Sequence, residues 1–208
     1  MKTDYFKHID SEEKAYWLGF LYADGCITTD KKYIILELSS EDLEHIKRFK
    51  DDIQAHQKIR IYKRNNIEYA RLCIGCKEMV LDLIKVGCIP HKTFNIVFPE
   101  ANIIPKNLIR HFIRGVFDGD GCISITNRKK KNKIYNIYTL SFLGTENLLN
   151  GINNELPVDN MNIFNRGNIF CMKTQCKQKI LDILNYLYNN CNTYLTRKYI
   201  KYNHLKCI

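Results

Sequence analysis

Two aspartates stand at matching places in a repeated segment and could together bind a divalent metal. Asp24 is the penultimate residue of WLGFLYADG (residues 17–25), and Asp120 is the penultimate residue of IRGVFDGDG (residues 113–121). Each segment is an apolar run that ends in Asp-Gly, which predicts a helix closed by a glycine. The helix dipole disfavours a carboxylate at this end by about 0.3–1 kcal/mol, so stability does not explain the acids. A lone Asp-Gly usually marks a turn, but two copies in matching helices favour an all-oxygen Mg²⁺ site.

The two helices must pack closely for these carboxylates to meet. Small residues recur at the same four-residue spacing in both: Gly19, Ala23, Gly115 and Gly119. Residues four apart share one helix face, and small side chains let two backbones approach, as in small-xxx-small contacts of membrane helices. Side-by-side packing along these faces would place Asp24 next to Asp120. Asp118 lies about 200° around its helix from Asp120, so we expect it to be peripheral.

The duplication extends beyond the helices. Residues 76–84 match 176–184, and the helix start at 40–43 parallels 145–148. Each half therefore has the order helix, strand, strand, helix, strand, strand, helix, which predicts an α+β pseudo-dimer. The repeats are expected at residues 1–98 and 107–208, with a linker over 99–106 that holds two of the four prolines.

Composition restricts the partners. The formal charge of +10 with a pI of about 9.1 favours a polyanion, and nucleic acid is preferred to a membrane because the sequence has no long apolar helix. The polar start and nine cysteines indicate reduced thiols and an intracellular location, whether bacterial, phage or organellar. Cys73, Cys76, Cys88 and His91 have the spacing of a zinc site. However, Cys73 falls in an alternating strand and residues 77–87 are predicted to be helical, which disfavours zinc.

Alternation along the strands predicts sheets with one apolar and one basic, aromatic face. Ile59 and Ile61 are expected on the apolar face, and residues 127–131 are expected to form a basic hairpin tip that contacts phosphate. The residues expected to contact nucleic acid are Lys58, Arg60, Tyr62, Arg64, Tyr69, Arg71, Arg128, Lys130, Lys133 and Tyr135.

On the paired segments 17–25 and 113–121 and the repeat order, the chain resembles LAGLIDADG homing endonucleases of the single-chain, two-repeat type. The resemblance implies two αββαββα repeats that pack through the motif helices, with antiparallel sheets forming a saddle on DNA. It implies that Asp24 and Asp120 bind Mg²⁺ or Mn²⁺, with the backbone carbonyls of Ala23 and Gly119 as further ligands.

The resemblance also implies a lysine near each scissile phosphate. Lys92 and Lys198 match these positions, and Arg197 competes with Lys198 because the alignment there is loose. Leu38 and Leu143 stand where many relatives have a polar Gln at the end of the second strand. Water positioning would then need other groups.

The implied activity is that of a site-specific, metal-dependent endonuclease that cuts both strands of a DNA duplex and leaves 3′ overhangs. The unequal halves predict a partly palindromic target and a monomeric enzyme, and such enzymes are encoded by introns and other mobile genetic elements. One alternative is a maturase that binds intron RNA, and a second is a DNA-binding protein that does not cleave. A third, independent of the resemblance, is a basic RNA-binding protein with an accidental repeat.

Overall fold

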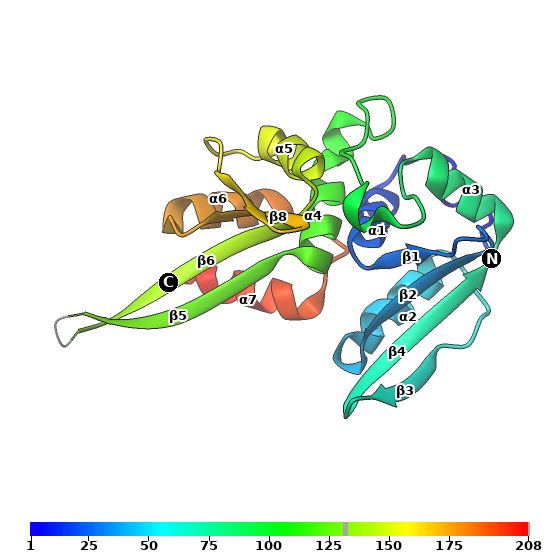
Figure 1. Cartoon of the computed structure of the whole chain (residues 1–208), viewed down its shortest axis with the longest axis horizontal. Coiled ribbons are helices and arrows are strands. Elements are labelled where there is room, and N and C mark those ends of the chain that lie inside the picture. The colour runs from blue at the N-terminus through cyan, green and yellow to red at the C-terminus, as the bar shows by residue number, and fades with distance from the viewer. Residues whose placement is uncertain (131–132, 208) are drawn as a thin grey trace.

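The computed structural model describes residues 1–130 and 133–207, and it confirms the α+β fold with two similar halves (Figure 1). Each half contains a four-stranded antiparallel sheet, with strand order β1-β2-β4-β3 in the first and β5-β6-β8-β7 in the second. The first half contains α1 (Glu12–Ala23), β1 (Gly25–Ile27), β2 (Tyr33–Ser39), α2 (Leu43–Asp52), β3 (Arg60–Arg64), β4 (Ile67–Gly75) and α3 (Lys77–Lys85).

The second half repeats this order and adds a helix. Its elements are α4 (Ile109–Asp120), β5 (Cys122–Lys130), β6 (Lys133–Gly144), α5 (Glu146–Glu155), β7 (Ile163–Arg166), β8 (Ile169–Thr174), α6 (Lys177–Tyr188) and α7 (Thr196–Lys206). The added α7 has no counterpart in the predicted repeat. Three short 3-10 turns, Ser40–Asp42, Lys92–Phe94 and Lys106–Leu108, lie in connections.

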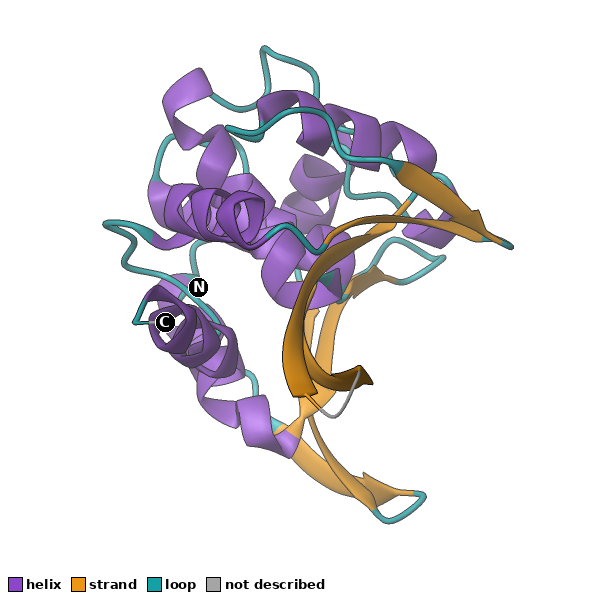
Figure 2. Cartoon of the chain, turned by 90° about the vertical axis from the view of Figure 1, so that its left-hand side faces the viewer, coloured by secondary structure: helices purple, strands orange, loops and turns teal. Residues whose placement is uncertain are grey.

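The strands gather on one side of the molecule and most helices on the other (Figure 2). Alternate residues of β2 and β4, such as Leu36 and Leu72, are fully buried beneath the first sheet. Their neighbours along each strand point to the opposite face, called the open face here because none of the described helices covers it (Figure 2). Within the described residues, no helix is long and apolar enough to span a membrane.

α1 and α4 pack side by side at the centre and join the halves. Eight consecutive residues of α1, from Ala15 to Tyr22, are buried. A helix that is apolar on all sides is typical of one enclosed by protein, since α1 contacts both its own half and α4. Ser11 caps α1 by accepting a hydrogen bond from the Lys14 backbone N–H at 3.3 Å.

The β5–β6 hairpin differs from the expected basic loop. β5 continues to Lys130 and pairs Arg128 with Tyr135, so these residues lie in a long two-stranded arm that extends from the body (Figure 1). Lys131 lies outside the described residues. Ile61, expected on the buried face, is 53% exposed because β3 is the edge strand and extends beyond the core.

Candidate active site

The contact between α1 and α4 depends on two glycines that face each other's helix. A Cβ atom on Gly19 would overlap the carbonyl oxygen of Phe112, and one on Gly115 would overlap that of Tyr16. Tyr16 and Phe112 each directly precede one of the two motifs, so the two contacts are related by pseudo-twofold symmetry. A Cβ on Gly119 would overlap the Cβ of Ala23. Only glycine permits this backbone approach.

The close packing brings Asp24 and Asp120 together at the same end of the two helices. Asp24 is the C-cap residue of α1 and Asp120 is the last residue of α4. A Cβ on Gly119 would stand 3.2 Å from Asp24 Oδ2, which places that carboxylate directly against the final turn of α4. Burial and then the charge of Asp120 raise the pKa of Asp24 to about 6, and burial raises the pKa of Asp120. The acids therefore form an electrostatically unfavourable pair, which a cation would relieve.

A lysine binds the C-terminal carbonyls of each motif helix. Lys92 Nζ donates to Tyr22 O at 2.7 Å and to Ala23 O. Lys198 Nζ donates to Phe117 O, to Asp118 O at 2.7 Å and to Gly121 O at 2.6 Å. Each ammonium binds carbonyls in the last turn of a helix, where helical partners run out, and places positive charge at the negative end of a helix dipole. Burial lowers the pKa of Lys198 to about 8.

The donor set fits a hard divalent cation such as Mg²⁺ or Mn²⁺. Two carboxylates and backbone carbonyls offer only oxygen, and the described residues include no cluster of three or more His, Cys, Asp or Glu side chains. A cavity of about 290 Å³, whose lining includes Ala23, Lys92 and Asp120, adjoins the acids and has room for water. The Ala23 carbonyl already accepts from Lys92, and the Gly119 carbonyl from Lys198 at 3.4 Å. A metal would have to share these oxygens through their second lone pairs.

Asp118 is not peripheral, contrary to our expectation, because it is fully buried. Its carboxylate accepts hydrogen bonds from the Tyr16 hydroxyl at 2.8 Å, the Tyr188 hydroxyl at 2.5 Å and the Leu195 backbone N–H at 2.7 Å. These donors come from α1, from α6 and from the start of α7, which carries Lys198. Burial nevertheless raises the pKa of Asp118. The position of Asp118 around the helix correctly separates it from the acidic pair. It could not show that α6 and the start of α7 cover that side of α4.

Lys198, not Arg197, is the geometric counterpart of Lys92. Arg197 points away and pairs with Asp42, with Nε 3.0 Å from Oδ2. The sequence alignment was loose here because Lys92 lies in a 3-10 turn whereas Lys198 lies in an α-helix.

Strand register corrects the match between Leu38 and Leu143. In the first half Gly25 pairs with Leu36, so Glu37 is the β2 residue level with Asp24. In the second half Cys122 pairs with Ser141, so the same count places Leu143 level with Asp120. The counterpart of Leu143 is therefore Glu37, and Leu38 is on the buried face, 8% exposed. The halves differ at this position, with a carboxylate in one and an apolar side chain in the other.

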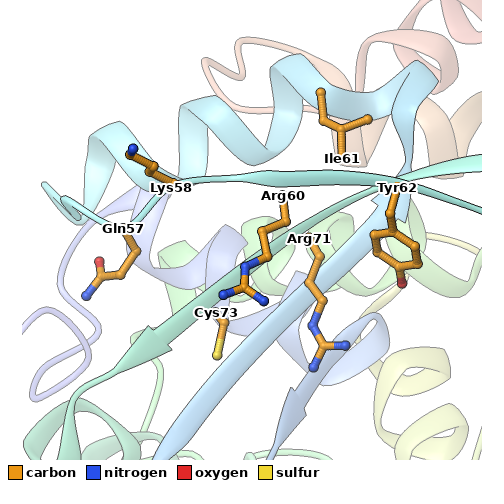
Figure 3. Close-up of a pocket in the computed structure, with 7 residues that line it drawn as sticks. All are labelled: Gln57, Lys58, Arg60, Ile61, Tyr62, Arg71 and Cys73. Atoms are coloured by element: carbon orange, nitrogen blue, oxygen red, sulfur yellow. The ribbon is translucent and has the colours of Figure 1, made fainter.

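The first sheet carries its expected nucleic-acid contacts on the open face. Arg60 pairs with Arg71 and Tyr62 with Tyr69, and paired residues share a face. Arg64, also on this face, lies over the Tyr69 ring at 4.6 Å. Lys58 precedes β3 and lines, with Arg60, Tyr62 and Arg71, a hollow of about 850 Å³ (Figure 3).

The second sheet places its expected contacts along the β5–β6 arm. Arg128 and Tyr135 form a cross-strand pair, and Lys133 pairs with Lys130. Lys133 and Tyr135 are exposed; the Lys130 side chain lies outside the described part of the structure.

The second half of the chain matches a known protein family. Residues 113–208 match the model of a family described as LAGLIDADG endonuclease. That range begins at the second motif and includes Asp120 and Lys198. A search of curated proteins found no significant match.

Solved structures share the fold over nearly the whole chain. I-SmaMI, a meganuclease solved with uncleavable DNA, has a TM-score of 0.64 at 12% identity, covering 93% of this chain and 87% of its own. I-SmaMI with uncleaved DNA and calcium has a TM-score of 0.63 at 12% identity, covering 91% and 89%. I-AabMI with uncleaved DNA has a TM-score of 0.59 at 12% identity, covering 92% and 87%. At these identities the likeness shows the fold.

Proposed function

From its place in the LAGLIDADG family, to which this two-repeat chain belongs, we propose that the protein is a site-specific endonuclease that cuts both strands of duplex DNA. One observation carries the proposal. Packing at Gly19 and Gly115 unites Asp24 and Asp120 at one end of the helix pair, with a lysine on each helix end. A fold that only bound nucleic acid would gain nothing from two facing carboxylates.

The two aspartates and the two lysines would have different roles in the reaction. Asp24 and Asp120 would hold Mg²⁺ or Mn²⁺, which when bound activates water and stabilises charge on the scissile phosphate. Lys92 donates to two carbonyls, so one of its three N–H groups remains to bind a phosphate oxygen. Lys198 faces four carbonyls and acts through its charge.

The arrangement of the halves supports an expectation about the cleavage products. The acids lie between two sheets whose open faces suit adjacent stretches of major groove. Cutting across the intervening minor groove would give staggered ends with 3′ overhangs. Because the open faces of the sheets carry different residues, the target is expected to be only partly palindromic, and one chain with both halves would act as a monomer.

A cleavage selection tests the proposal. The protein is incubated with a randomised duplex library and Mg²⁺, and the new ends are sequenced. We expect discrete double-strand breaks with 3′ overhangs that vanish in Asp24→Asn and Asp120→Asn. Arg197→Ala, which removes a nearby charge outside the site, should still cleave. Intact DNA under all these conditions would overturn the proposal, and tight binding of intron RNA in its place would identify a maturase.

A further inference from the structure

The row of cross-strand residues nearest the acids differs completely between the two sheets. In the first sheet, Glu37 pairs with Arg71, and Arg71 pairs with Arg60. In the second sheet, counting the same number of residues from the motif, the row is Leu143, Cys171 and Phe164. Both rows begin level with the motif aspartates. The structure therefore places charged and apolar side chains at symmetry-equivalent positions. In the apolar row Cys171 is buried, so Leu143 and Phe164 are its accessible members.

The arrangement of the charged row is not explained by phosphate binding alone. Arg60 and Arg71 are directly opposed, and like charges in that arrangement destabilise a sheet. Glu37 lies 3.6 Å from Arg71 Nη1 and 3.4 Å from Arg64 Nη2. A carboxylate on a DNA-binding face repels phosphates, so it does not serve affinity. Its contacts instead fix the direction of the Arg71 guanidinium.

A fixed guanidinium is suited to a base edge. Arginine binds guanine O6 and N7 through two parallel hydrogen bonds, and that geometry requires a defined orientation. Arg60 forms no ion pair among the described residues and lines the same hollow as Arg71, and the two side chains extend in the same direction across the sheet (Figure 3). The hollow thus presents guanidinium groups from two adjacent strands.

The apolar row offers a different contact. Phe164 is 44% exposed although it is a large hydrophobic residue, and Lys173 Nζ lies 5.5 Å from its ring. Leu143 lines the cavity next to Asp120. Neither Phe164 nor Leu143 can hydrogen-bond a base through its side chain. Apolar side chains in the major groove contact the thymine methyl group.

We propose that Arg60 and Arg71 read guanine in one half-site, with Glu37 as the positioning residue, and that Phe164 and Leu143 contact thymine at the equivalent position of the other half-site. This inference rests on the proposed function. It requires the target to depart from palindromic symmetry at one matched pair of positions close to the cut.

Selection by binding tests the inference separately from cleavage. The whole protein is equilibrated with randomised duplexes in EDTA, which prevents cutting, and bound DNA is sequenced. We expect guanine enriched at one position of one half-site, with about 5- to 150-fold discrimination, and thymine at its counterpart.

Variants assign the preference to residues. Arg60→Ala and Arg71→Gln should lose the guanine enrichment, and Phe164→Ser should lose the thymine enrichment. Glu37→Gln should weaken the guanine enrichment without lowering affinity for unrelated duplex, because it removes a charge that repels phosphate. Lys63→Ala is the matched control, since Lys63 lies on the same strand, pairs with Glu68 and faces the opposite side. It should leave the selected sequence unchanged.

The outcomes separate the two proposals. Identical bases at the matched positions, or enrichment unchanged in Arg60→Ala and Arg71→Gln, would overturn the inference. A selected asymmetric sequence that is not cut with Mg²⁺ would support the readout and overturn the endonuclease. Absence of any selected sequence would overturn both.

Discussion

At the scale of single residues, the charged form of Asp24 lowers the stability of the metal-free protein. Its pKa is raised from 3.8 to about 6 by burial and by Asp120, so the folded state disfavours the charged form. A group with a raised folded-state pKa stabilises the protein most when it is protonated, and this stability is lost as pH rises through about 6.

Asp24→Asn should therefore raise the melting temperature at pH 8 without metal, and the gain should shrink as pH falls towards 4.5. Thermal melts across this range measure it. Mg²⁺ or Ca²⁺ should raise the melting temperature of the wild type more than that of the variant. Equal melting temperatures at pH 8, with equal responses to the cation, would contradict the acidic pair.

The two lysines should differ in their effect on stability. Lys198→Met removes the donor to the Asp118 and Gly119 carbonyls at the end of α4 and to the Gly121 carbonyl after it. It should cost about 1–3 kcal/mol of stability and should also reduce cleavage. Lys92→Met should mainly reduce cleavage, because Lys92 is only partly buried. Since the pKa of Lys198 is lowered to about 8, wild-type cleavage should also decline above that pH. Urea unfolding and cleavage-rate profiles distinguish these effects, with Arg197→Ala as control.

Asp118 should prove essential to stability. Replacing it with alanine leaves the Tyr188 hydroxyl and the Leu195 N–H without an acceptor and leaves the Tyr16 hydroxyl only His45 Nε2, so it should cost about 3 kcal/mol by denaturant unfolding. Tyr188→Phe removes only one of these hydrogen bonds and should cost about 1 kcal/mol. Similar losses in the two variants would show that the carboxylate is not the centre of this network.

At the scale of elements, the α1–α4 contact places the strictest limit on residue size, because a side chain at its glycines would overlap backbone atoms. Gly115→Ala should destabilise the protein by about 3 kcal/mol, because the added methyl group meets Tyr16 backbone, which has no room to move. Gly144→Ala is the control, since its nearest neighbour is the flexible end of Leu148 at 3.2 Å. Calorimetry on both variants tests the difference, and a stable Gly115→Ala protein would contradict the close packing.

The elements show what the sequence could and could not predict. The motif helices and the repeat order follow from local signals. The strand register, the burial of Asp118 and the place of α7 depend on contacts between distant segments. Periodicity identifies a strand's two faces, but it does not state which residue stands opposite which. For that reason the sequence alone suggested Leu38 as the counterpart of Leu143, whereas the strand register shows that the counterpart is Glu37.

At the scale of the whole molecule, a charge of +10 and two basic sheet faces predict salt-sensitive DNA binding. If the protein neutralises about 6–10 phosphates, affinity should fall by about 10³–10⁵ between 50 and 200 mM salt. Fluorescence anisotropy across this range gives the slope. Arg128→Ala should reduce the slope by about one unit if it contacts phosphate. A flat salt response would argue against the sheets as the binding surface.

A buried ion pair between Glu12 of α1 and Arg114 of α4 joins the two halves on one side of the pseudo-twofold axis. Arg114 is fully buried, and its Nη2 lies 2.7 Å from Glu12 Oε1. In the opposite direction across the pseudo-twofold axis, the corresponding residues are Leu108 and Leu18. Two first halves from separate copies would set Glu12 against leucine, and two second halves would enclose Arg114 without an acid. Burying an unpaired charge costs several kcal/mol. This one-sided salt bridge therefore disfavours the exchange of halves between two copies of the chain.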